Sequence, residues 1–189
     1  MPRIAKLSKH ALVEKLSVVF ENNGFAGASM AMLAKASGLS KASLYHFFPG
    51  GKQEMATQAL GQAGARLQAL ILAPLTNGPS AQDRLHASLE GTANYYAGAA
   101  PICLMNSLLV GDGAILFAEQ IRQAVEVWQK SLSSAYEEAG ADLAEARAWA
   151  AYAIERIQGA LILCRVKASR SPLEVCLSEL KADVDLLET

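Results

Sequence analysis

The residues of this sequence best suited to bind another molecule lie between Ser29 and Lys52, in the stretch SMAMLAKASGLSKASLYHFFPGGK. A glycine divides this stretch into two segments, and each is too short to enclose a core of its own. The second segment opens with Ser-Lys-Ala-Ser and closes with an aromatic cluster. Small, hydroxyl and basic side chains at the front of a short helix suit the major groove of DNA, which is wide enough to admit a helix. The stretch therefore predicts a DNA-binding surface.

The side chains of this surface divide between those that could read bases and those that could hold phosphates. Lys41 can donate to guanine edges or to phosphate, Ala42 permits close approach, and Ser43 can donate or accept. Tyr45 and His46 carry polar atoms that can bind phosphate oxygens, which position a protein on DNA without specifying the sequence. The predicted DNA-binding residues are Ser29, Ser40, Lys41, Ala42, Ser43, Tyr45, His46 and Lys52.

Lys52 stands at the expected start of a helix, where it could hold a phosphate together with free backbone N–H groups. It could also be no more than a solvated residue at the helix start, and Tyr45 could belong to the core. Arg3, Lys6 and Lys9 could add non-specific attraction for phosphates. The sequence leaves these alternatives open.

Charge is distributed unevenly along the chain. Residues 1–55 hold seven Lys and Arg against three acids, a balance of +4, whereas residues 56–189 hold ten against fifteen, a balance of −5. The net charge of −1 therefore hides a basic head on an acidic body. Such asymmetry indicates a polyanionic partner for the head, and the acidic body would help to orient its approach.

The elements that position these residues are all predicted to be helices. Apolar residues recur at helical spacing, serine and aspartate supply N-caps, and no alternating β-branched pattern indicates a strand. Ser171 is expected to cap the last helix, with Pro172 at its first position. The expected helices begin at Ser8, Ser29 and Ser40, then cover about 52–72, 80–96, 102–109, 114–139 and 142–167, and end with the helix after Ser171. The fold class is therefore all-α with about nine helices.

A family resemblance extends over roughly residues 8–60. It is carried by LAKASG at Leu33–Gly38, LSKASLY at Leu39–Tyr45, the pair Phe47–Phe48, and Lys52. In identity and spacing these motifs resemble the helix-turn-helix of the tetracycline-repressor (TetR) family of bacterial transcription regulators. Two positions depart from the family pattern: Phe47 stands where His is frequent, and Lys52 follows the last aromatic residue by four places rather than three.

The resemblance implies a chain of two parts. Residues 1–55 would form a three-helix DNA-binding domain with Ser40–Phe47 as recognition helix, and residues 56–189 would form a larger helical domain for ligand binding and dimerisation. It also implies a homodimeric repressor that binds a pseudo-palindromic operator in double-stranded DNA and is released by a small-molecule effector. No cofactor is expected.

Two apolar stripes near the C-terminus could bury against a second copy or within the chain's own core. In the family the last two helices pair with their twofold mates as a four-helix bundle. The resemblance therefore implies a dimer interface through Trp149, Ile157, Leu161, Leu173, Leu177, Leu180 and Val184.

Aromatic residues, methionine and one arginine in the body could line an effector pocket, although such residues at helical spacing are more often plain core. Few charges among them would suit a mainly apolar or aromatic effector, oriented by Arg156 or by tyrosine hydroxyls. The candidate pocket residues are Tyr95, Met105, Phe117, Trp128, Tyr152 and Arg156.

Other functional classes find less support. Three widely spaced cysteines show no metal-ligand pattern, and no nucleophile elbow or complete phosphate loop indicates an enzyme. The N-terminus lacks the apolar stretch of a signal peptide, and no run is long enough to cross a membrane, so we expect a cytoplasmic protein without a membrane partner. The alternative function is a helical small-molecule-binding or scaffolding protein that does not bind DNA.

Overall fold

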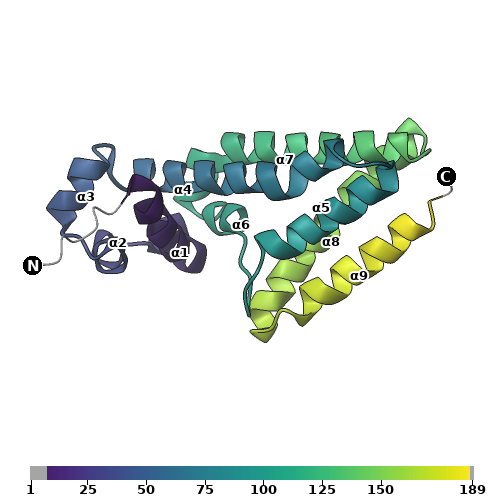
Figure 1. The fold of residues 1–189 in the computed structure, drawn as a ribbon. Coiled ribbons are helices and arrows are strands. Elements are labelled where there is room, and N and C mark those ends of the chain that lie inside the picture. The colour runs from purple at the N-terminus through teal and green to yellow at the C-terminus, as the bar shows by residue number, and fades with distance from the viewer. Residues whose placement is uncertain (1–7, 188–189) are drawn as a thin grey trace, which may run out of the picture. The chain divides into compact units, whose positions relative to one another are not determined.

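The computed structural model describes residues 8–187, so Arg3 and Lys6 lie outside the described residues. Within that range the chain forms nine α-helices and no strand, which confirms the predicted all-α class. The helices are drawn in Figure 1: α1 (Lys9–Gly27), α2 (Met30–Ser37), α3 (Lys41–Phe47), α4 (Gly51–Leu67), α5 (Ala81–Tyr95), α6 (Leu104–Leu108), α7 (Asp112–Glu138), α8 (Leu143–Lys167) and α9 (Ser171–Asp185).

The helices belong to two compact units. The first contains the residues up to 63 together with 104–119, and the second contains 64–103 together with those from 120 onward. The chain leaves the first unit within α4, returns to it at the start of α6 and leaves it again within α7. The division of functions at residue 55 stays a prediction, but the first compact unit includes a segment, α6 and the start of α7, that lies far along the sequence.

The first unit packs α1, α2 and α3 around a small apolar core. Serine N-caps begin all three helices as expected: Ser8, Ser29 and Ser40 each accept a hydrogen bond from a backbone N–H two or three residues into the helix. Gly24 interrupts α1 with a φ of 66°. The fully buried side chains of this core are Leu12, Leu16, Phe20, Leu33, Leu44, Phe48 and Met55.

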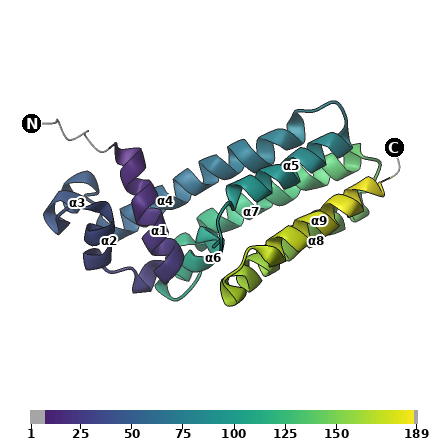
Figure 2. The same ribbon diagram turned by 60° about the horizontal axis from the view of Figure 1, so that its bottom comes forward.

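The second unit holds α5, α8 and α9, and both views of the ribbon show α8 and α9 side by side (Figures 1 and 2). The expected helix over 52–72 ends earlier, at Leu67, and continues as a π-helical turn over Gln68–Leu72 and a 3₁₀ turn over Ala73–Thr76. The reason lies in α5, which approaches this turn closely. Ser88 Oγ donates to the Ile71 carbonyl at 2.8 Å, and a Cβ on Gly91 would lie 1.6 Å from the Leu70 carbonyl oxygen.

The last helix begins differently from the expectation. Ser171 is the first helical residue rather than the cap, and Arg170 stands at the capping position without a side-chain cap bond. Ser169 Oγ accepts from the Ser171 N–H at 3.2 Å, so a serine two residues earlier satisfies that donor. The Arg170 guanidinium instead donates to the carbonyls of Tyr96 at 3.0 Å and Ala93 at 2.7 Å, and so caps the C-terminus of α5.

Candidate nucleic-acid interface

The turn between α2 and α3 is fixed by backbone bonds and one buried hydroxyl. Gly38 adopts the left-handed conformation, with φ 73° and ψ 18°, and its N–H donates to the Ala34 carbonyl at 3.1 Å. The Leu39 N–H donates to the same carbonyl at 3.2 Å, which completes a Schellman-type helix end. Ser37, which is buried, donates from Oγ to the Ala34 carbonyl and accepts from the Leu39 N–H. The angle at which α3 leaves α2 is therefore held by several bonds.

The outward face of α3 carries the residues predicted to meet DNA. Lys41, Ala42 and His46 are exposed, and Tyr45 is 50% exposed, whereas Leu44 on the opposite face is fully buried. Tyr45 is therefore a surface residue, although the sequence left a core position open. The structure brings the exposed side chains together on a single helical face, as groove binding requires.

Three serine hydroxyls take part in the helix starts of this interface. Ser29 Oγ accepts from the Met32 N–H at 3.2 Å, and Ser40 Oγ accepts from the Ser43 N–H at 3.0 Å. The hydroxyl oxygens of Ser40 and Ser43 are 2.9 Å apart, so these two also share a hydrogen bond. Their local roles fix the hydroxyls in place at the front of α2 and α3.

Lys52 is not simply solvated, because its ammonium group contacts Phe25. Its Nζ donates to the Phe25 carbonyl at 2.9 Å and lies 4.4 Å from the centre of the Phe25 ring. At the start of α4, the Gly50 N–H donates to Glu54 Oε2 at 2.8 Å, and Lys9 Nζ lies 3.5 Å from the same carboxylate. A carboxylate therefore already satisfies one of the amide donors that we expected a phosphate to use.

Phe25, Glu54 and Ser37 also belong to this site, although they were not among the residues predicted for it. Glu54 had a usable signal, because an acidic residue in the first turn of a helix commonly satisfies the N–H groups there. Ser37 likewise precedes the turn glycine directly. Phe25 had no such signal, because its partner Lys52 is 27 residues away along the chain.

The six candidate pocket residues are not gathered in one unit. Met105 and Phe117 are buried in the first unit, while Trp128 is buried in the second. Tyr95 packs edge-on against Tyr96 with ring centres 4.7 Å apart. Tyr152 is 46% exposed, and its hydroxyl accepts from Arg156 Nη1 at 2.7 Å, so this pair lies on the outer face of α8. The effector pocket stays a prediction.

Most of the residues predicted for the dimer interface face the interior of the second unit. Trp149 is half-buried and packs edge-on against Tyr136. The remaining six are buried where α8 and α9 pack within one copy: Ile157, Leu161, Leu173, Leu177, Leu180 and Val184. These six are not free to contact a partner. An apolar stripe shows which face of a helix is buried. It does not show whether that face packs within one copy of the chain or against a second copy.

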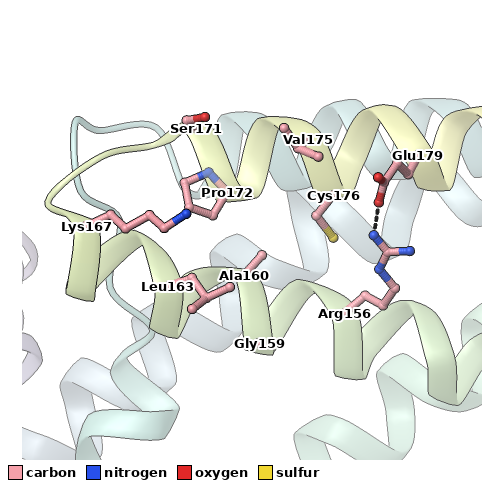
Figure 3. Close-up of a pocket in the computed structure, with 10 residues that line it drawn as sticks. All are labelled: Arg156, Gly159, Ala160, Leu163, Lys167, Ser171, Pro172, Val175, Cys176 and Glu179. Carbon is pink, nitrogen blue, oxygen red and sulfur yellow. Dashed lines mark hydrogen bonds and ion pairs between the residues drawn. The ribbon is translucent and has the colours of Figure 1, made fainter.

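A different set of apolar side chains on α8 and α9 is exposed. Leu163, Val166 and Val175 are between 49% and 76% exposed. Leu163 and Val175 border a surface groove of about 500 Å³ between the two helices (Figure 3), whereas Val166 is not among the residues that line it. An ion pair between Arg156 and Glu179 crosses one end of it. The residues that line the groove are Arg156, Gly159, Ala160, Leu163, Lys167, Ser171, Pro172, Val175, Cys176 and Glu179.

The polar chemistry of the second unit offers little reactivity. Burial raises the pKa of the Cys176 thiol, and the neighbouring Arg156 only partly offsets that shift. Burial likewise raises the pKa of Tyr96 well above its usual value. Among the described residues there is no cluster of His, Cys, Asp or Glu that could hold a metal. Within residues 8–187, no helix has the length and apolar character that a membrane span requires.

Comparisons with known proteins agree with this geometry. Residues 8–59 match the model of bacterial regulatory proteins of the tetR family, and residues 97–179 match the C-terminal domain of LmrA/YxaF-like transcriptional regulators. Two relatives from Bacillus subtilis, the uncharacterized HTH-type transcriptional regulator YxaF and the HTH-type transcriptional regulator LmrA, are 24% and 23% identical over 170 residues. These alignments cover 88% of this chain and 89% and 90% of the relatives.

Solved structures show the same fold. A TetR transcriptional regulator from Legionella pneumophila superposes with a TM-score of 0.80 at 17% identity, over 96% of this chain and 99% of that one. One from Chloroflexus aurantiacus gives 0.77 at 19% identity, over 94% and 93%. These identities support the fold alone, whereas the two family models together match well over half of the chain. This chain therefore belongs to the tetR family of bacterial regulatory proteins, which are transcription regulators and not enzymes.

Proposed function

We propose that this protein is a dimeric transcriptional repressor that binds a pseudo-palindromic operator and leaves it when a small effector binds. The observation that carries the proposal is the exposed face of α3, where Lys41, Ala42, Tyr45 and His46 stand out from a fixed helix-turn-helix. Polar and basic groups on a helix of this size suit base edges and phosphates together.

In this proposal α3 enters the major groove with its N-terminal end foremost. Lys41 and Ser43 meet base edges there, while Ala42 allows the backbone to approach. Tyr45 and His46 bind phosphates, and Lys52 adds a phosphate contact at the start of α4. Each phosphate contact makes the affinity depend on salt, because binding releases counterions from the DNA.

A second copy of the chain is the proposed occupant of the exposed face of α8 and α9. The exposed apolar residues Leu163 and Val175 border a groove there, and Val166 is exposed on the same helix as Leu163. Gly159 has no neighbour within 4 Å of a built Cβ, so a partner helix could approach closely. An operator with twofold symmetry also requires a protein with two heads. These outward residues replace the buried ones as the interface that we propose.

The effector is proposed to be small and mainly apolar or aromatic, bound by the helical body, with no cofactor. It can release the DNA only if it binds more tightly to a conformation that the operator disfavours. Effector and operator should then weaken each other's binding by the same factor.

The test is a titration of the purified protein against duplexes from the DNA upstream of its own gene, followed by fluorescence anisotropy at several salt concentrations. We expect saturable binding with one dimer per pseudo-palindrome and a Kd that rises steeply with salt. The matched control is Lys41→Ala, which leaves the core intact and should weaken binding. If no duplex is bound more tightly than random DNA, the repressor proposal fails. The alternative function, a helical small-molecule-binding or scaffolding protein that does not bind DNA, is then favoured.

A further inference from the structure

The ammonium group of Lys52 is held by a residue that lies outside the helix-turn-helix. Its Nζ donates to the Phe25 carbonyl at 2.9 Å and stands 4.4 Å from the centre of the Phe25 ring. We propose that Phe25 is a positioning residue for operator binding, which fixes Lys52 for a phosphate contact, and that Ser107 on α6 fixes Phe25 in turn. This inference rests on the proposed function.

The backbone before Phe25 is set by a tight contact with α6 inside the first unit. Gly24 has a φ of 66°, and a Cβ built on it would lie 2.9 Å from the Ser107 carbonyl oxygen. Ser107 Oγ donates to the Glu21 carbonyl at 2.7 Å, so the same residue touches both sides of the break in α1. Ser107 is buried, and therefore water cannot replace this bond without exposing the contact.

The ring of Phe25 is held by the start of α7. It packs edge-on against Phe117, with ring centres 5.3 Å apart and an angle of 71° between the rings. A Cβ built on Gly113 would lie 3.2 Å from the Phe25 Cβ, which leaves little space for the ring to shift. Carbonyl and ring are thus both placed by residues of α6 and α7.

This arrangement prepares Lys52 for an anion. An ammonium has three donors, and the carbonyl takes only one, so the others remain for a phosphate. A free lysine side chain loses rotamer entropy when it binds, whereas one already fixed by a carbonyl and a ring loses less. Lys41, by contrast, is simply exposed at the front of α3.

The inference makes α6 part of the DNA-binding machinery, although α6 lies more than 50 residues after Lys52 in sequence. Removing the Phe25 ring, the Ser107 hydroxyl or the Lys52 ammonium should then change the same property, which is the phosphate contact of Lys52. A residue that only supports the core would change stability and would act independently of Lys52.

The experiment measures operator Kd over a series of salt concentrations for the full chain and its variants. Lys52→Met should weaken binding about tenfold and reduce the slope of log Kd against log salt by about one. Phe25→Leu should weaken it about threefold with a smaller loss of slope, as expected for one cation–π contact. Phe25→Tyr keeps the ring and should remain within about twofold of the unmodified protein. Ser107→Ala should weaken binding less than Phe25→Leu.

The decisive measurement combines the variants. In the Lys52→Met background, Phe25→Leu and Ser107→Ala should have no further effect on Kd, because the group they position is gone. Phe20→Leu is the matched control: Phe20 is fully buried, its ring lies 6.4 Å from that of Phe25, and its effect should be the same in both backgrounds.

Two results would overturn the inference. If Phe25→Leu weakens binding equally with and without Lys52, Phe25 is only a core residue, and the proposed repressor function is untouched. If the unmodified protein binds no operator at all, both the inference and the proposed function fail. Thermal melting of every variant separates lost affinity from lost folding.

Discussion

The helix-turn-helix of the first unit and the face of α8 and α9 in the second unit present different kinds of surface. In the first, α2 and α3 bury Leu33 and Leu44 and expose lysine, serine, tyrosine and histidine beside a partly exposed Met32. In the second, α8 and α9 bury one apolar stripe against each other and still leave Leu163, Val166 and Val175 exposed. Polar groups on a rigid helix suit a polyanion, whereas an exposed apolar patch indicates a protein partner. The comparison shows that the kind of binding partner is better inferred from the side chains that remain exposed in the fold than from the apolar stripes in the sequence.

The largest expected effect distinguishes the buried stripe of the second unit from its exposed one. Leu180→Glu places a carboxylate at a position that is 2% exposed and should destabilise the fold by about 4 kcal/mol or more. Val175→Glu changes a side chain that is 54% exposed, so it should leave the melting temperature nearly unchanged and dissociate the dimer. Sedimentation and thermal melting measure both outcomes. Dimers that survive Val175→Glu would place the interface elsewhere.

Glycine substitutions compare the interiors of the two units. Gly91→Ala forces a Cβ to within 1.6 Å of the Leu70 carbonyl, so α5 and the π-helical turn Gln68–Leu72 must separate, at a cost of about 3 kcal/mol or more. Gly24→Ala meets the Ser107 carbonyl at 2.9 Å and keeps a positive φ, at a cost of about 2 kcal/mol. Denaturant unfolding should rank them in this order.

The control for both glycines is Gly61→Ala in α4, where a Cβ meets nothing within 4 Å. This variant should be stabilised by about 0.5 kcal/mol, because alanine favours the helix more than glycine does. If Gly61→Ala lowers the free energy of unfolding instead, the open space around Gly61 and the helix propensity of alanine do not explain the stability of this part of α4.

Lysine substitutions test whether operator binding depends on direct contacts of the exposed face of α3 or on the overall charge of the protein. Lys41→Ala should weaken operator binding by about 1–3 kcal/mol, because it loses a contact with a base or a phosphate. Lys130→Ala in α7 removes the same charge from the second unit and should change the Kd very little. Anisotropy titrations at constant salt measure both. Equal losses would show that net charge, rather than the face of α3, governs binding.

The last expected effect is a dependence of stability on pH that arises from a tyrosine of the second unit. Burial, with a smaller contribution from Asp183, raises the pKa of Tyr136 from 10.0 to about 12. The unfolded chain therefore loses this proton first, and the free energy of unfolding falls as pH rises from 10 to 12, by about 2 kcal/mol at most. Below pH 10 the tyrosine is protonated in both states and has no effect. Tyr136→Phe should show a shallower fall in alkaline unfolding curves, and an unchanged fall would contradict the assignment.

The sequence predicted well those features that depend on neighbours along the chain. Ser8, Ser29 and Ser40 begin their helices, and Gly38 lies in the turn between two helices, because capping and helix ends need only residues a few places away. The inward positions of Leu44 and Phe48 follow from helical periodicity in the same way. The motif that carries the family resemblance lies entirely within these local elements.

Only the tertiary structure decided which surfaces remain free. Leu180 and Val175 both lie on α9 among apolar residues, yet one is enclosed and the other exposed, because the packing of α8 and α9 selects one face. The contact of Phe25 with Lys52, and of Ser107 with Glu21, joins residues that are 27 and 86 places apart. A sequence pattern repeats at the period of a helix and therefore determines which side of a helix is apolar. It does not determine which distant segment covers that side, and here that choice sets both the proposed dimer face and the position of the lysine that we propose binds phosphate.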